Sequence, residues 1–167
     1  MIELRELTTE DGHDVYEMIK EIPTEENGFI NSLFANTFEA FQDKLIRYDK
    51  LAQGINLAPG FVPETIYWLY VDGRPVGYGK LRHYLNDSLR QHGGHIGYVI
   101  TPSARKQGYG KHMLAEILKK ARGKQIEEVL VTCDESNIAS RKVIEANQAR
   151  LAKIKGDSCF YWINLSE

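Results

Sequence analysis

The residues between Tyr98 and Leu114 have the types and the spacing that could bind a phosphate group. Gly108 and Gly110 lack a Cβ atom, so the backbone there can approach a ligand closely and adopt dihedral angles that other residues avoid. A helix beginning directly after them would aim its first N–H groups, which have no acceptor inside the helix, at a bound anion. Positive side chains gather in the same stretch, at Arg105, Lys106 and Lys111. This chemistry suits a phosphorylated cofactor.

Two familiar nucleotide motifs do not account for this loop. The pattern G-x-x-x-x-G-K-[ST] fails because Lys111 is followed by His112 and no glycine lies five residues before Gly110. The dinucleotide pattern G-x-G-x-x-G fails because position 113 is Met. The loop therefore either binds phosphate in another way or is an ordinary turn, which is what a lone Gly-x-Gly before a helix most often is.

Hydrophobic periodicity predicts the elements that position the loop, with a strand at His95–Thr101 before it and a helix at Tyr109–Arg122 after it. Upstream, the pattern predicts a strand at Ile2–Leu7, a helix capped by Thr8 or Thr9 and stopped by Pro23, a helix at Phe38–Gln53, and a hairpin of Thr65–Val71 and Val76–Leu81. Downstream, it predicts a strand at Glu128–Thr132, a helix at Ile138–Ala146, and a hairpin of Leu151–Ile154 and Phe160–Leu165. This order indicates one α/β (α+β) domain, residues 1–167, with a mixed central sheet.

The hexad Arg105–Gly110, directly after a strand, resembles the Q/R-x-x-G-x-G/A signature of the GNAT superfamily of N-acetyltransferases. The order of elements is similar to that superfamily over essentially the whole chain, and Asn137–Ser140 begins the helix expected next. Three further stretches, Leu81–Asn86, Gly93–Tyr98 and Cys133–Glu145, resemble a bacterial subgroup of predicted acetyltransferases. The resemblance implies a mixed, mostly antiparallel central sheet, flanked by helices and splayed between its fourth and fifth strands.

The resemblance also implies a cosubstrate, acetyl-CoA, and direct transfer of the acetyl group to the amine of a small molecule or peptide. Backbone groups of Val99 and Ile100 would bind the pantetheine arm, and one of their N–H groups would stabilise the oxyanion. Asn137 would contact the same arm or simply cap its helix, and Ser140 would satisfy a free backbone N–H. Backbone amides of the loop would bind the pyrophosphate; the loop consists of Arg105, Lys106, Gln107, Gly108, Tyr109, Gly110 and Lys111.

The acid that protonates the departing thiolate differs from the common pattern. Many superfamily members have a Tyr seven residues after the Asn, but here that position is Ile144, which cannot donate a proton. Tyr98, Tyr109 and Tyr161 are the remaining hydroxyl candidates. The missing Tyr leaves open a second function, an acetyl-CoA-binding or sensing domain without catalysis.

Two histidines are the main candidates for the base that deprotonates the amine. The imidazoles of His95 and His83 can accept a proton near physiological pH, and His95 lies on the strand that carries the cofactor. Each has the alternative of being a structural or surface residue. Glu64, before the first hairpin strand, is a weaker candidate.

Composition and charge limit the classes of partner and the compartment that the sequence allows. Twenty-one Lys and Arg against 23 Asp and Glu give a net charge of −2, which argues against a nucleic-acid partner. No apolar stretch is long enough to span a membrane, and no signal-peptide layout is seen, so a cytoplasmic protein is expected. Cys133 and Cys159 have no metal-ligand spacing and are expected to be reduced thiols. A homodimer is expected from the family alone.

Overall fold

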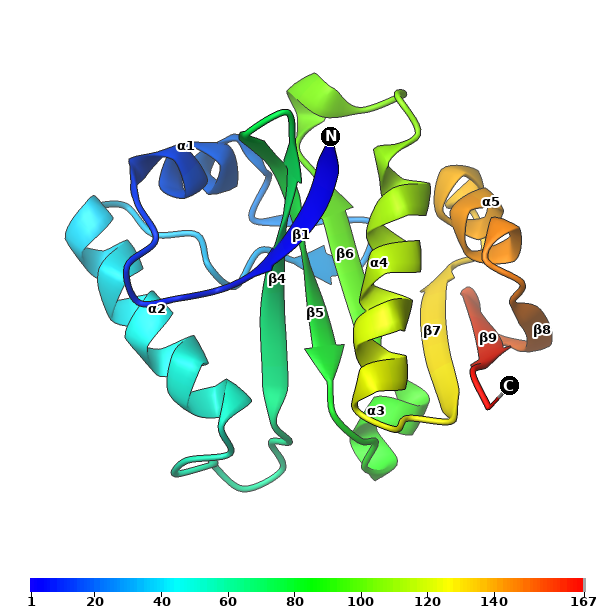
Figure 1. Cartoon of the computed structure of the whole chain (residues 1–167). Coiled ribbons are helices and arrows are strands. Elements are labelled where there is room, and N and C mark those ends of the chain that lie inside the picture. The colour runs from blue at the N-terminus through cyan, green and yellow to red at the C-terminus, as the bar shows by residue number, and fades with distance from the viewer. Residues whose placement is uncertain (167) are drawn as a thin grey trace.

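Two antiparallel sheets form the centre of the computed structural model, which describes residues 1–166 (Figure 1). The first sheet has the order β1 (Ile2–Glu6), β4 (Glu64–Val71), β5 (Arg74–Arg82), β6 (Ile96–Ile100). The second has the order β7 (Glu128–Asp134), β9 (Ser158–Asn164), β8 (Arg150–Lys155). The break between β6 and β7 confirms the predicted fold class, with its splay between the fourth and fifth strands of the central sheet.

The two sheets are joined only at one end of this break, among the residues that the structure describes. The N–H of His95 donates to the carbonyl oxygen of Leu130 at 2.8 Å, and the N–H of Leu130 donates to Nδ1 of His95 at 2.9 Å. An isolated bridge between Gly94 and Val131 accompanies these bonds. From there β6 and β7 run in the same direction without pairing, with α4 (Tyr109–Gly123) as the connection between them (Figure 1). The sheets therefore form a V that is closed at His95.

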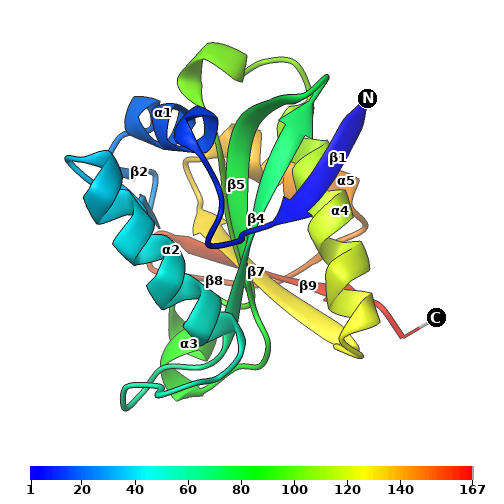
Figure 2. The ribbon, with the colours of Figure 1, turned by 60° about the vertical axis from the view of Figure 1, so that its left-hand side comes forward.

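Helices cover both faces of the first sheet (Figure 2). The helices α1 (His13–Glu21) and α2 (Phe38–Ala52) pack on one face, where Trp68 and Tyr78 are fully buried. The helix α4 packs on the other face, against Leu69 and Leu81. Alternation along β4 and β5 thus supplies two hydrophobic cores, because successive side chains of a strand point to opposite faces. α5 (Ile138–Ala146) packs against α4 and β7.

Some local predictions differ from the structure. Helix α1 begins after Gly12 rather than at Thr8 or Thr9, because the Thr8 hydroxyl accepts the N–H of Glu10 and the Asp11 carboxylate accepts the N–H of Thr8, which makes a turn there. The predicted loop at 23–36 contains a small hairpin, β2 (Glu25–Glu26) and β3 (Phe29–Ile30), and a short helix, α3 (Asp87–Gln91), was not predicted. A single 3-10 turn at Pro102–Ala104 follows β6. None of the helices within residues 1–166 is long and apolar enough to cross a membrane.

Candidate active site

A cavity of about 1020 Å³ follows the opening of the V and continues onto the face of the first sheet that carries α1 and α2. The cofactor half of this cavity is lined by β6, β7 and the beginnings of α4 and α5. The other half lies outside the V, on the face of the first sheet, and is called the acceptor half below; it is lined by the β2–β3 hairpin, the end of α2 and the polar ends of β4 and β5. One continuous cavity therefore reaches both the predicted phosphate loop and a second compartment.

The pairing of β6 with β5 decides which backbone groups of β6 face the opening. The N–H of Arg82 donates to the oxygen of His95, and the N–H of Thr101 donates to the oxygen of Val76. In an antiparallel ladder hydrogen-bonded pairs alternate with non-bonded pairs, so Val99, midway in this register, is bonded to β5. The backbone groups of Tyr98 and Ile100 point the other way, into the V. The sequence offered the N–H groups of Val99 and Ile100 as oxyanion donors. The N–H of Ile100 is free for this role, whereas the prediction for Val99 is wrong because its N–H is bonded to β5.

The same reasoning applies to β7 on the opposite wall. The N–H of Leu165 donates to the oxygen of Glu127, which places the hydrogen-bonded pairs of β7 and β9 at the odd-numbered residues of β7. The backbone groups of Thr132 and Asp134 therefore point toward β6. Both walls of the V therefore present main-chain groups that no neighbouring strand pairs. Two carbonyl oxygens among them already accept a hydrogen bond, that of Ile100 from Nε of Arg105 and that of Asp134 from the N–H of Asn137.

The N-terminus of α4 is uncapped. Its N-cap is Gly108 in the left-handed region, at φ 82°, and it has no side chain to accept the first N–H groups of the helix. By contrast, Thr37, Asn86 and Asn137 cap α2, α3 and α5 with side-chain oxygens. A Cβ atom at Gly108 would meet nothing within 4 Å, so the loop is open to the cavity. The first turn of α4 therefore presents free donors at the positive end of a helix dipole.

The side chains of the predicted loop have different roles. The Arg105 guanidinium binds both oxygens of Glu26 on β2, with Nη1 at 3.0 Å from Oε2, and its Nε donates to the oxygen of Ile100 at 2.9 Å. This pairing holds the pKa of the Glu26 carboxyl below its usual value. Lys106 and Lys111 are exposed and line the cavity. Gln107 does not line it; its Oε1 accepts the Tyr109 hydroxyl at 3.2 Å.

Tyr98 brings a hydroxyl to the start of α5. Its Oη lies 3.0 Å from Oγ of Ser140, whose backbone N–H donates to Oδ1 of Asn137 at 3.2 Å. The Asn137 side chain is thus a helix cap, as one of the two readings of the sequence predicted. Burial raises the pKa of Tyr98 to about 12, so the hydroxyl stays protonated at neutral pH. Ile144, at the position of the missing Tyr, is fully buried in the core.

The acceptor half contains three charged side chains, those of Glu64, Lys80 and Arg82, of which the sequence analysis singled out only Glu64. The Glu64 carboxylate, only 9% exposed, lies 3.3 Å from Nε of Arg82 on the neighbouring strand. Lys80, 7% exposed, donates from Nζ to the oxygen of Ile30 at 3.0 Å. Burial lowers the pKa of Lys80 to about 8. The signal for Lys80 was present in the sequence, because strand alternation puts it on the same face as the apolar Tyr78.

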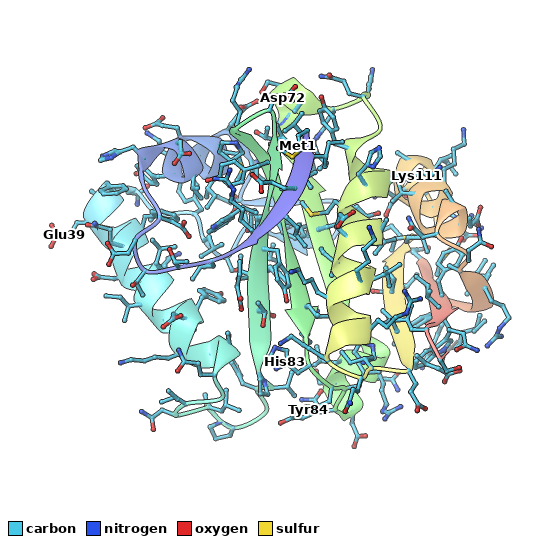
Figure 3. All side chains as sticks on the ribbon, in the orientation of Figure 1. Met1, Glu39, Asp72, His83, Tyr84 and Lys111 are labelled. Atoms are coloured by element: carbon cyan, nitrogen blue, oxygen red, sulfur yellow. The ribbon has the colours of Figure 1, made fainter. Side chains whose placement is uncertain are left out.

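Neither histidine candidate lines the cavity. His95 is buried, its Nδ1 accepts a backbone N–H, and burial lowers its pKa to about 4. A neutral imidazole with its basic nitrogen already occupied cannot take a proton from an amine, so the prediction of His95 as the base is corrected. His83 lies at the far end of the sheet from Lys111 and the start of α4 (Figure 3), with Nε2 at 2.7 Å from Oγ1 of Thr65. Its place outside the cavity, with Nε2 held by Thr65, argues against His83 as the base as well. No cluster of three or more metal-ligating side chains occurs within residues 1–166.

A sheet split into a V, with main-chain groups free on both walls and an uncapped helix at its mouth, opens onto a cavity with room for an extended phosphorylated ligand and a second compound beside it. The chain belongs to the acetyltransferase (GNAT) family, whose sequence model matches residues 17–148. It is an N-acetyltransferase, and acetyl-CoA is its cosubstrate. No curated protein sequence matches the chain significantly.

Solved structures of bacterial enzymes share the fold at low sequence identity. The Campylobacter jejuni N-acetyltransferase PseH, in complex with acetyl coenzyme A, is 15% identical, with a TM-score of 0.66 over 99% of this chain and 100% of that one. RimL, a ribosomal L7/L12 α-N-protein acetyltransferase in complex with coenzyme A, is 17% identical, with a TM-score of 0.71 over 99% and 94%. An N-acetyltransferase from Staphylococcus aureus Mu50 is 18% identical, with a TM-score of 0.65 over 99% of each chain.

Proposed function

We propose that acetyl-CoA lies in the V with its pantetheine arm between β6 and β7 and its diphosphate at the beginning of α4. The observation that carries this proposal is the set of main-chain groups that no strand pairs: those of Tyr98 and the N–H of Ile100 on one wall, and those of Thr132 and the N–H of Asp134 on the other. An arm with two amide groups of its own fits between such edges. The uncapped first turn after Gly108 supplies donors for phosphate oxygens, so the residues present fit the cosubstrate.

The cosubstrate supplies an acetyl thioester, and the acceptor amine attacks its carbonyl carbon directly. A C–N bond forms and the C–S bond breaks, the amine loses one proton, and the sulfur gains one. Negative charge develops on the carbonyl oxygen during the attack, and the free N–H of Ile100 is the donor proposed to stabilise it. Two proton-transfer groups are then needed, one on each side of the reacting carbon.

Tyr98 is proposed as the acid. Its hydroxyl lies against Ser140 on α5, so a donor from β6 reaches the helix on which Ile144 replaces the usual Tyr. With its pKa raised to about 12, Tyr98 remains protonated and can donate to the leaving sulfur at neutral pH. The pair of hydroxyls offers the proton directly or through Ser140.

Glu64 is proposed as the group that takes the proton of the amine. Its carboxylate lines the acceptor half of the cavity. It lies on β4, which is separated from β6 by β5 alone. Arg82 holds it in place from the opposite register position on β5.

We further propose a cytoplasmic homodimer. A reduced cytoplasmic setting agrees with Cys133 and Cys159, which lie opposite each other on β7 and β9 as free thiols. A second copy agrees with the exposed apolar side chains Leu151 and Ile154 on the outer strand β8. Light scattering on the purified protein tests the dimer, and a monomer at all concentrations would exclude it.

A thiol-release assay with acetyl-CoA and a library of amines tests the catalytic proposal. An enzyme releases CoA only when a suitable acceptor is present, whereas an acetyl-CoA-sensing domain would bind the thioester in calorimetry and release no thiol with any amine. Absence of any binding of CoA or acetyl-CoA would overturn the assignment of the V as the cofactor site.

A further inference from the structure

The cavity carries an excess of positive charge in a chain whose net charge is −2. Its six cationic lining residues are Arg47, Lys80, Arg82, Arg105, Lys106 and Lys111, and its three carboxylates are Glu26, Glu64 and Asp134. The cations at 105, 106 and 111 lie in the phosphate loop. The other three lie in the acceptor half with two carboxylates, Glu64 on β4 and Glu26 on β2, of which Glu26 is bound by Arg105 of the loop. The excess in the acceptor half is not needed for the diphosphate.

Lys80 is the central cation of the acceptor half. Nine-tenths of its surface is buried, and no carboxylate oxygen of residues 1–166 lies within 4.0 Å of its Nζ. One hydrogen-bond partner is present, the oxygen of Ile30, and the ring centroid of Phe29 lies 4.8 Å from Nζ. An ammonium has three N–H donors, so two remain for a ligand. Burying a charge is costly, and burial lowers the pKa of Lys80 to about 8, with the Glu64 carboxylate opposing the shift and Arg82 adding to it.

Arg82 is held so that it faces the same space. Its Nε lies beside Glu64, and its Nη1 donates to the oxygen of Gly94 at 3.2 Å, while no partner of Nη2 occurs within residues 1–166. Lys80 and Arg82 are two residues apart on β5, so their side chains leave the same face of the sheet about 7 Å apart. Two donors at this spacing can hold one carboxylate or phosphate group between them, and such charged hydrogen bonds are among the strongest in proteins.

We propose that the acceptor is an amine that also carries an anionic group, a carboxylate or a phosphate ester, and that Lys80 and Arg82 bind this group. The proposal rests on the acetyl transfer proposed above and adds the substrate class. Glu64, opposite Arg82 in the β4–β5 register, then lies beside the ammonium end of the same molecule. Arg47, at the outer edge of the cavity on α2, attracts the anion toward the site.

The test compares acceptors in matched pairs. Each pair differs only in the anion: amino acids against their amides, and amino-sugar phosphates against the unphosphorylated amino sugars. We expect kcat/KM to be about tenfold to a hundredfold higher for the anionic member of a pair, the range that charged hydrogen bonds usually give. The two series distinguish a carboxylate from a phosphate ester.

Lys80→Met gives the second arm, because methionine keeps the apolar stem and removes the charge. The variant is expected to lose about tenfold or more of kcat/KM on the anionic acceptor, by a rise in KM, to lose much less on the neutral member, and to keep the KM of acetyl-CoA. Lys50→Met, at an exposed position of α2 outside the cavity, is the control and should match the wild type.

Three outcomes would overturn the proposal. Equal kcat/KM for the neutral and anionic members would show that the anionic group is not recognised, while the proposed acetyl transfer would remain supported. An equal loss on both members in Lys80→Met would make Lys80 a structural residue. If no acceptor at all led to thiol release, the proposed function would fail, and this inference would fail with it.

Discussion

His95 offers the sharpest test of how the two sheets are joined. Its ring must be neutral for Nδ1 to accept the N–H of Leu130. Burial lowers the pKa of the folded ring to about 4, against 6.5 for an unperturbed histidine. Each pKa unit corresponds to about 1.4 kcal/mol, so the full effect on the free energy of unfolding is about 3 kcal/mol.

The sign follows from which state binds the proton. Between pH 6.5 and about 4 the unfolded chain binds a proton at this residue that the folded chain does not, so stability falls as the pH is lowered through this range. His95→Asn removes the titrating group and keeps an acceptor oxygen close to the position of Nδ1. The wild type should therefore lose about 2 kcal/mol more than the variant between pH 7 and pH 4.5.

Urea unfolding at the two pH values, followed by the fluorescence of Trp68 and Trp162, measures this difference. His112→Asn, at an exposed position of α4, is the control and should follow the wild type. A constant difference between the wild type and His95→Asn across the range would refute the role of the neutral ring as an acceptor. A hundredfold loss of turnover in a folded His95→Asn protein would restore His95 as the catalytic base.

Four further predictions concern the cavity. Gly108→Val should weaken CoA binding about tenfold or more in calorimetry, because the left-handed φ disfavours a β-branched residue, whereas Gly156→Val in the β8–β9 turn, at a similar φ, should leave the affinity unchanged. Tyr98→Phe should lower kcat about a hundredfold with little change in the KM of acetyl-CoA, and an unchanged kcat would exclude Tyr98 as the acid. Burial raises the pKa of Cys133 to about 11, so iodoacetamide should label it slowly at pH 7.5, and CoA should slow the labelling further because the thiol lines the cavity. The wild type should gain about 2 kcal/mol of stability relative to Lys80→Met from pH 7 to pH 9.5, because the buried amine loses its proton near pH 8 in the folded chain and near 10.5 in the unfolded one; equal pH dependence would contradict the buried charge.

Local sequence signals predicted most of the fold. Helix α5 has the predicted bounds, Ile138–Ala146, and the strand–loop–helix around Gly108 is present as expected, because apolar periodicity and helix caps are read within a few residues. The hairpin β2–β3 was missed because two-residue strands carry no periodic pattern. Helix α3 was missed because its five residues bury none of their side chains, so nothing marks an inner face.

The catalytic candidates were harder to predict because their roles depend on pairs of strands. A histidine beside the cofactor strand looks like a base until Leu130, 35 residues away, is seen to occupy its nitrogen. Val99 looked like an oxyanion donor, but the parity of the β5–β6 ladder turns its N–H toward β5. Such facts come from the register of distant segments, which single-sequence reasoning does not fix.

The contact between Arg105 and Glu26 has a consequence for how the proposed cofactor-binding loop can change in sequence. The Arg105 guanidinium is already engaged by a carboxylate and a carbonyl, so in the proposed binding mode main-chain donors and two exposed lysines hold the diphosphate. Binding by main-chain N–H groups requires a particular path of the backbone but places little requirement on which side chains the loop carries. Sequences can then diverge widely around the same path of the main chain. The fold itself is shared with solved structures at 15%, 17% and 18% identity.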